Sequence, residues 1–270
     1  MQYKLRGILS TQIILYNSNG RMRLQFCSDL HLNSHPVGVG YEFETILEPT
    51  AKALVICGDL GDPETMLVRD FFAWAHSRWD SIFWIPGFQE MGEAWTSMAA
   101  FQARIAFLKR LVEPYPTIYV CVRERFFTED GMLLLATPFW TRIPDKEVHQ
   151  SMPNLNDQHL ADFEWMRREI FVADLPVVVA TYMPPSYQMM DPFHKMPLHT
   201  VFWAADTEIL LRPPVVGWIT GHIHQALIMD RAWQEPTGEE KHIAIVSNAR
   251  GYQGEETGYR ADAVLRVGRV

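Results

Sequence analysis

Residues 22–31 read MRLQFCSDLH, an apolar run that ends in an acidic residue and a histidine. Such a run, bounded by polar residues, is typical of a buried β-strand. Asp29 and His31 lie two positions apart just past its end, so in an extended chain both side chains point to the same side. Carboxylate and imidazole ligands together suit a transition metal better than Ca²⁺. This stretch therefore predicts a strand that carries two metal ligands at its carboxyl end.

The same arrangement recurs twice along the chain. Residues 53–57 (ALVIC) are followed by Gly58-Asp59, and residues 215–220 (VVGWIT) by Gly221-His222-Ile223-His224. A glycine at the strand end lets the backbone turn sharply and present the next side chain. One such spacing says little, but three of them at strand ends predict a site for Zn, Mn, Fe or Ni.

Further elements complete a layered α/β pattern. Apolar runs predict strands at 81–85 and 176–180, and helical periodicity predicts helices at 64–77, 95–112, 160–171 and 202–211. The last third predicts a β-meander of residues 226–230, 242–246 and 263–267. We expect one α/β domain over residues 22–270, with two packed mixed sheets, helices on their outer faces and function at the strand ends. Residues 1–21 are predicted to be an N-terminal extension.

Composition narrows the function. With 24 Lys and Arg against 32 Asp and Glu, the net charge of −8 disfavours nucleic acid as a partner. The three cysteines, Cys27, Cys57 and Cys121, lie in or beside apolar runs and are predicted to be buried free thiols in a reducing compartment. No stretch of 18 apolar residues is present, so we expect no membrane span and a cytoplasmic protein.

Together these motifs resemble the calcineurin-like metallophosphoesterases, in particular the small bacterial and phage cytoplasmic type. The matching segments are SDLH (28–31), GDL (58–60), IPGxxE (85–90), TxxPPS (181–186), GHIH (221–224) and SNARGY (247–252). The resemblance implies a four-layer α/β/β/α sandwich with two metals at the strand ends. It also implies hydrolysis of a small phosphorylated substrate.

Three positions depart from the pattern of that family. Phe88 stands at the position of an Asn ligand, and Gln89 stands at the position of the His that protonates the leaving oxygen. Gln89 can donate a hydrogen bond but has no proton to give. Tyr182 replaces a ligand His; it either packs and hydrogen-bonds, which we favour, or ligates a ferric ion. The second metal site and the general acid are therefore predicted to be degenerate.

Carrying the family roles over residue by residue leaves one complete site. The first metal keeps Asp29, His31, Asp59 and His224, whereas the second keeps only the bridging Asp59 and His222. We therefore expect one divalent ion per chain.

Other residues have weaker claims on the site. His35, His194 and His199 lie in segments from which a replacement proton donor is possible, whereas His149 and His159 are predicted to be surface residues. Arg250 either contacts a phosphate or stabilises a turn.

Two functions remain open from the sequence. The first is a metal-dependent phosphoesterase with a weakened, single-metal site, a phosphatase-type hydrolase. The alternative is a catalytically inactive protein of the same fold that serves as a binding or scaffold module. A nuclease is disfavoured by the acidic charge.

Overall fold

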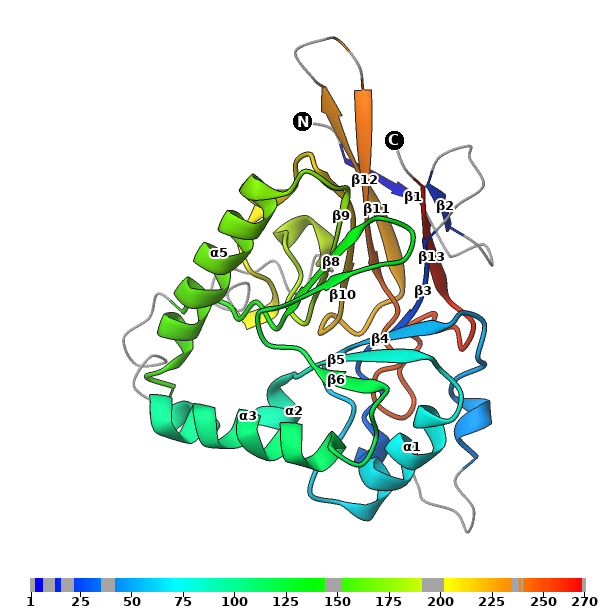
Figure 1. The fold of residues 1–270 in the computed structure, drawn as a ribbon, viewed down its shortest axis with the longest axis vertical. Helices are drawn as coiled ribbons and strands as arrows, with labels where there is room; N and C mark the ends of the chain where they lie inside the picture. The colour runs from blue at the N-terminus through cyan, green and yellow to red at the C-terminus, as the bar shows by residue number, and fades with distance from the viewer. Residues whose placement is uncertain are drawn as a thin grey trace.

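The computed structural model describes residues 3–6, 13–15, 22–34, 42–143, 152–190, 202–234, 238 and 240–268. Within these residues the strands form two sheets (Figure 1), of seven and six strands. The first has the order β1-β11-β12-β10-β9-β8-β7, with β1 Tyr3–Arg6, β7 Glu124–Phe127, β8 Leu133–Thr137, β9 Val177–Thr181, β10 Val215–Thr220, β11 Leu227–Gln234 and β12 Glu240–Ser247. The second has the order β2-β13-β3-β4-β5-β6, with β2 Ile13–Leu15, β3 Met22–Cys27, β4 Ala53–Cys57, β5 Ser81–Ile85, β6 Ile118–Val120 and β13 Val264–Val267. Both sheets are mixed, since each contains parallel and antiparallel pairs.

Helices cover the outer faces of the two packed sheets. Helices α1 (Met66–His76) and α3 (Met98–Val112) lie over the six-stranded sheet, and α5 (Leu155–Val172) lies along the seven-stranded sheet (Figure 1). A short helix, α2 (Phe88–Met91), and single 3-10 turns fill the connections. The result is the expected α/β/β/α sandwich. Among the described residues, no helix is both long and apolar enough to cross a bilayer.

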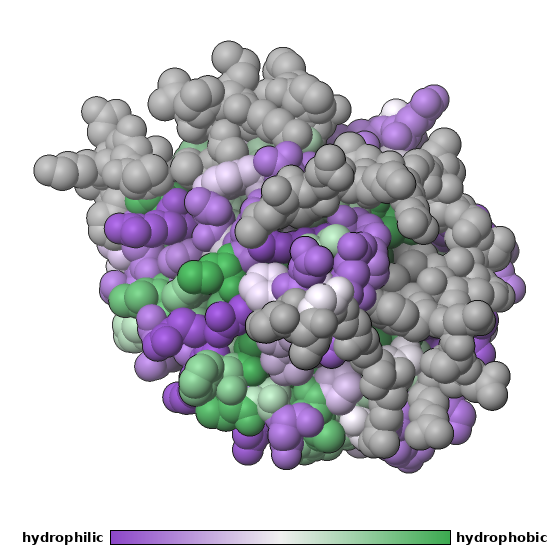
Figure 2. All heavy atoms as spheres, turned by 90° about the horizontal axis from the view of Figure 1, so that it is seen from above, coloured by the Kyte–Doolittle hydropathy of each residue, from purple (hydrophilic) through white to green (hydrophobic). Residues whose placement is uncertain are grey.

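The core lies between and beside the sheets. Strands β9 and β10 are buried at every position, as expected for parallel strands that are covered on both faces. Large apolar side chains that remain exposed, such as Met66, Phe127 and Phe171, are scattered over different elements. Among the coloured residues of Figure 2, hydrophilic and hydrophobic side chains are interspersed on the face seen from above. Single exposed apolar residues of this kind are normal for a folded domain.

Most predicted elements are confirmed. The strands at 22–27, 53–57, 81–85 and 215–220 have the expected bounds, and the strand predicted at 176–180 is shifted by one residue. The helices predicted at 64–77 and 95–112 correspond to α1 and α3, and α5 is longer than the predicted 160–171. Strands β6, β7 and β8 had not been predicted. Cys27, Cys57 and Cys121 are buried free thiols.

The helix predicted over residues 202–211 is wrong for most of its length. Residues 204–211 contain only the 3-10 turn Glu208–Leu210. The amides of Ala205 and Thr207 donate to the carbonyls of Pro184 and Pro185 instead of to helical partners. Tertiary hydrogen bonds to the neighbouring segment have thus replaced the helical ones.

The predicted C-terminal meander is also wrong in part. Strands β11 and β12 form the expected antiparallel pair, but β13 lies in the other sheet, antiparallel to β3. There it covers the edge of β3, and Leu265 is fully buried. Strands β1 and β2, from the predicted N-terminal extension, pair with β11 and β13. The division between residues 1–21 and 22–270 stays a prediction.

Candidate metal centre

The site lies where β3, β4 and β10 end. An isolated bridge between Ser28 and Ala249 joins the chain just past β3 to the segment after β12. Gly221 follows β10 and lies against the Cys57 carbonyl and the Ser28 side chain, where a Cβ atom would clash. Glycine at this position therefore allows the ends of the two sheets to approach each other closely.

The backbone at the site is unusual. Asp29, His31, Asp59, His222 and His224 all have positive φ angles, of 50°, 43°, 50°, 70° and 43°. Non-glycine residues rarely adopt this left-handed region, and when they do they cluster at functional sites. The premise that the chain stays extended through Asp29 and His31 is therefore wrong, although both side chains still reach the same site.

Backbone hydrogen bonds hold these strained turns. The amide of Asp29 donates to the Gly58 carbonyl at 2.9 Å, and the amide of His31 donates to the Asp59 carbonyl at 3.0 Å. The buried Glu90 carboxylate accepts the amides of Asp59 and Leu60 at 3.0 and 2.7 Å. The first two strand ends thus brace each other.

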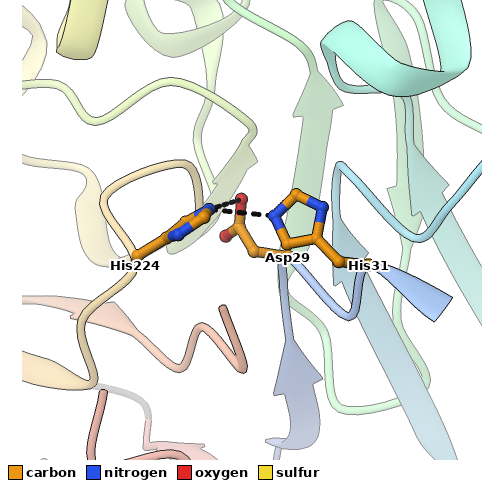
Figure 3. Close-up of side chains that lie close together, drawn as sticks. All are labelled: Asp29, His31 and His224. Atoms are coloured by element: carbon orange, nitrogen blue, oxygen red, sulfur yellow. Dashed lines mark hydrogen bonds and ion pairs between the residues drawn. The ribbon is translucent and has the colours of Figure 1, made fainter. Parts of the chain in front are cut away.

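The first group of candidate ligands consists of Asp29, His31 and His224, whose ligand atoms lie within 4.8 Å of one another. Figure 3 shows the two imidazoles facing each other beside the carboxylate, with 2.9 Å between their Nε2 atoms. Nε2 of His224 lies 3.6 Å from Oδ1 of Asp29 (Figure 3). This Oδ1 is buried and has no hydrogen-bond partner among the described residues. A buried oxygen left unsatisfied beside two convergent imidazoles fits a divalent transition metal.

Glu255 orients one of these ligands. Its Oε2 accepts a hydrogen bond from Nδ1 of His224 at 2.7 Å and another from the amide of Tyr252 at 2.8 Å. The proton on Nδ1 leaves the lone pair of Nε2 directed at the site, as carboxylate–histidine pairs do in metal centres. Glu255 was not predicted to belong to the site, because it carries none of the strand-end signals that mark the other residues.

The second group consists of Asp29, Asp59 and His222. Here the hydroxyl of Tyr182 donates to Oδ2 of Asp59 at 2.8 Å and lies 2.6 Å from Nδ1 of His222. Nε2 of His222 lies 2.8 Å from the carbonyl of Phe202, which can only accept, so this nitrogen carries a proton. Both ring nitrogens of His222 are therefore directed at protein groups, and Tyr182 lies between the two residues expected to hold the second metal.

The Tyr182 ring fills this position tightly. It is fully buried and lies against Gly58 and Gly87, at each of which an added Cβ atom would clash with the ring. The Phe88 ring packs edge-on against Tyr182, with 5.6 Å between ring centroids. Burial and the nearby Asp59 carboxylate raise the pKa of the Tyr182 phenol well above its ordinary value, so it keeps its proton.

The backbone and charge around Asp59 are also set by residues 87–90. The amide of Gln89 donates to Oδ1 of Asp59 at 2.8 Å. Burial, and next the charge of Asp59, raises the pKa of Glu90 to about 8. Burial likewise raises the pKa of Asp29, to which the Asp59 charge adds, and the pKa of Asp59 itself. A bound cation would offset this crowding of carboxylates.

The structure describes two of the residues with weaker claims on the site, Arg250 and His159. The Arg250 guanidinium donates to the Leu30 carbonyl at 3.2 Å. His159 is half-buried, with Nδ1 2.6 Å from the Trp140 carbonyl, so the prediction that it is a surface residue is wrong. His35, His149, His194 and His199 lie outside the described residues.

Comparison with known proteins finds one family model and several similar proteins. A sequence model of the calcineurin-like phosphoesterases matches residues 22–226. The uncharacterized protein L509 of Acanthamoeba polyphaga mimivirus is 19% identical over 251 residues, which cover 80% of this chain and 84% of that protein. The crystal structure of TT1561 of Thermus thermophilus has a TM-score of 0.45 at 13% identity, covering 84% of this chain and 88% of its own. A further crystal structure has a TM-score of 0.47 at 10% identity and covers 84% and 90%.

Proposed function

Because this chain belongs to the calcineurin-like phosphoesterase family, a family of metal-dependent hydrolases, we propose that it cleaves small phosphoesters with one divalent ion per chain. One observation carries the single-metal proposal: the Tyr182 hydroxyl bonds both Asp59 and His222. A second dication would sit about 3.5–4 Å from the first and would need those two residues as ligands. The phenol faces Nδ1 of His222 and the Phe202 carbonyl faces its Nε2, so neither ring nitrogen of His222 is left for a second ion.

The ion would be held by Asp29, His31 and His224, with Asp59 as the fourth ligand. Asp59 belongs to the adjacent group and is hydrogen-bonded through both oxygens, but each carboxylate oxygen has a further lone pair to offer. When bound, the ion supplies Lewis acidity, which polarises a phosphoryl oxygen and lowers the pKa of the attacking water. Four mixed ligands of this kind suit Zn, Mn, Fe or Ni.

The residue at the general-acid position, Gln89, limits which substrates can react. Gln89 has no proton for the leaving oxygen, and loss of a general acid costs about 10²–10⁴ in rate. Aryl esters leave without protonation, whereas alkyl esters do not. We therefore expect slow turnover that is confined to small aryl phosphoesters.

Metal content and turnover test this proposal together. The protein, dialysed after loading with Mn, Zn, Fe or Ni, is expected to retain one ion per chain by elemental analysis and to hydrolyse an aryl phosphate but not an alkyl one. His224→Ala is expected to lose both ion and activity. Two firmly held ions per chain, or rapid turnover of an unactivated alkyl diester, would contradict the single-metal proposal.

A second candidate function is a catalytically inactive binding or scaffold protein. It is favoured by the Gln89 position, where the general acid is absent. A protein that takes up no metal, and in which His224→Ala behaves like wild type, would favour it over the hydrolase.

Reversion of the degenerate positions separates these outcomes further. Phe88→Asn, Gln89→His and Tyr182→His together are expected to raise the metal content to two per chain and to increase turnover, because ligands and acid act as a unit. The three single variants are the controls and are expected to gain little. A triple variant that folds, binds two ions and stays inert would mean that another position has diverged.

We also propose a cytoplasmic location. The three buried free thiols support it, because cysteines in oxidising compartments are mostly paired.

A further inference from the structure

The loop at residues 250–252, in which the sequence pointed only to Arg250, lies over the candidate metal ligands. Gly251, with φ of 74°, donates its amide to the Asp29 carbonyl at 2.9 Å, and the Arg250 amide donates to the Ser28 carbonyl at 3.0 Å. A side chain on Gly251 would clash with Glu255, so the tight turn needs glycine. The next residue, Tyr252, is thereby fixed against the site.

The Tyr252 ring is held by the ligands themselves. It stacks on His31 with 4.1 Å between ring centroids and an interplanar angle of 20°, and it meets His224 edge-on at 5.0 Å. Its amide donates to the same Glu255 oxygen that accepts from His224. Yet the side chain is 45% exposed, so it borders the space from which a substrate approaches.

The Tyr252 phenol lies beside the charged groups of the site. The carboxylates of Asp59 and Asp29 and the side chain of Gln89 lie near it. Because the ring is stacked on His31 and partly exposed, its hydroxyl is within reach of a phosphoryl group that binds at the first ligand group.

We propose that Tyr252 is a catalytic residue whose hydroxyl donates a hydrogen bond to a non-bridging oxygen of the substrate phosphoryl group. The inference rests on the proposed function and adds the group that recognises the phosphate. In a site with one cation instead of two, a fixed neutral donor supplies part of the missing electrostatic stabilisation of the phosphoryl oxygens. Ring stacking on His31 and the Glu255 contact hold the donor in place before substrate binds.

Tyr252→Phe tests the proposal, because it keeps the stacked ring and removes only the hydroxyl. The probe is inorganic phosphate, titrated calorimetrically into protein loaded with Mn²⁺, alongside turnover of an aryl phosphate. A hydrogen bond to a charged group is worth enough to expect about a 10- to 100-fold weaker phosphate affinity and a similar loss of kcat. Mn²⁺ affinity is expected to change less than twofold. Tyr119→Phe, at a tyrosine of similar exposure on the edge strand β6, is the matched control and is expected to match wild type.

The outcomes distinguish the role of Tyr252 from the hydrolase proposal on which it rests. Equal phosphate affinity and turnover in wild type and Tyr252→Phe would overturn the role of Tyr252 and leave the hydrolase proposal standing. A wild-type protein that takes up Mn²⁺ but neither binds phosphate nor turns over would overturn both. If no metal is taken up, the hydrolase proposal fails, and phosphate titration of the metal-free pair still decides whether the hydroxyl contacts the anion.

Discussion

Removal of the Tyr182 hydroxyl is expected to destabilise the metal-free protein strongly. Tyr182→Phe preserves the ring that packs against Gly58 and Gly87 but leaves Oδ2 of Asp59 and Nδ1 of His222 without the phenol. Each buried polar group that loses its partner costs about 1–3 kcal/mol, so two of them predict a loss of about 2–6 kcal/mol in the free energy of unfolding.

Urea unfolding in the presence of a chelator measures this loss. The matched control is Tyr259→Phe, which removes a single hydrogen bond of 2.8 Å from a tyrosine hydroxyl to the Ile46 carbonyl. It is expected to cost about 0.5–1.5 kcal/mol. If Tyr182→Phe proves no more destabilising than Tyr259→Phe, the hydroxyl does not bridge Asp59 and His222, and the argument for a single metal loses its basis.

Three further outcomes are expected. Burial raises the pKa of Glu90 to about 8 in the folded state, against 4.5 in the unfolded state, so the folded state binds this proton more tightly. The contribution of Glu90 to the free energy of unfolding is therefore greatest below pH 4.5 and is lost as the pH rises toward 8. Urea unfolding of metal-free protein at pH 5 and pH 8 checks this, and a rise in stability across that window would contradict it. Glu255→Gln is expected to weaken metal affinity about 10- to 100-fold through His224, measured by competition with a chelating dye, whereas the neighbouring Glu256→Gln serves as an unchanged control. Gln89→His alone is expected to raise aryl phosphate turnover less than tenfold, because Tyr182 still occupies the second metal site. An increase in turnover of more than tenfold in steady-state kinetics would show that the missing acid alone was limiting.

Local sequence determined the elements that form the site. Short apolar runs, each ended by a polar residue or glycine, located β3, β4 and β10 to the residue, because the burial of a strand shows in the local pattern of apolar residues. Since the carboxyl ends of neighbouring parallel strands meet at one edge of a sheet, Asp29 and Asp59 were expected to lie close together, and they do. The family resemblance followed from the same motifs.

Contacts between segments that are distant along the chain could not be predicted from the sequence. Residues 202–211 carry a helical pattern, but hydrogen bonds to the segment at Pro184 and Pro185 prevail over it. Strand β13 follows β12 in sequence but pairs with β3, because β3 would otherwise be an edge strand with unpaired backbone N–H and C=O groups. Local propensity does not contain either interaction.

The sequence by itself therefore determined which side chains reach the strand ends and that a metal is the ligand they suit. Only the tertiary structure decided what replaces the second metal, because the Tyr182 hydroxyl contacts Asp59 and His222 across 123 and 40 residues of chain. The same holds for Glu255, which orients His224 from 31 residues away. A substitution read in sequence shows only that a ligand is lost. The atom that takes the position of the lost ligand depends on how closely the surrounding segments pack. Here the glycines at residues 58 and 87 leave the space that the Tyr182 ring fills.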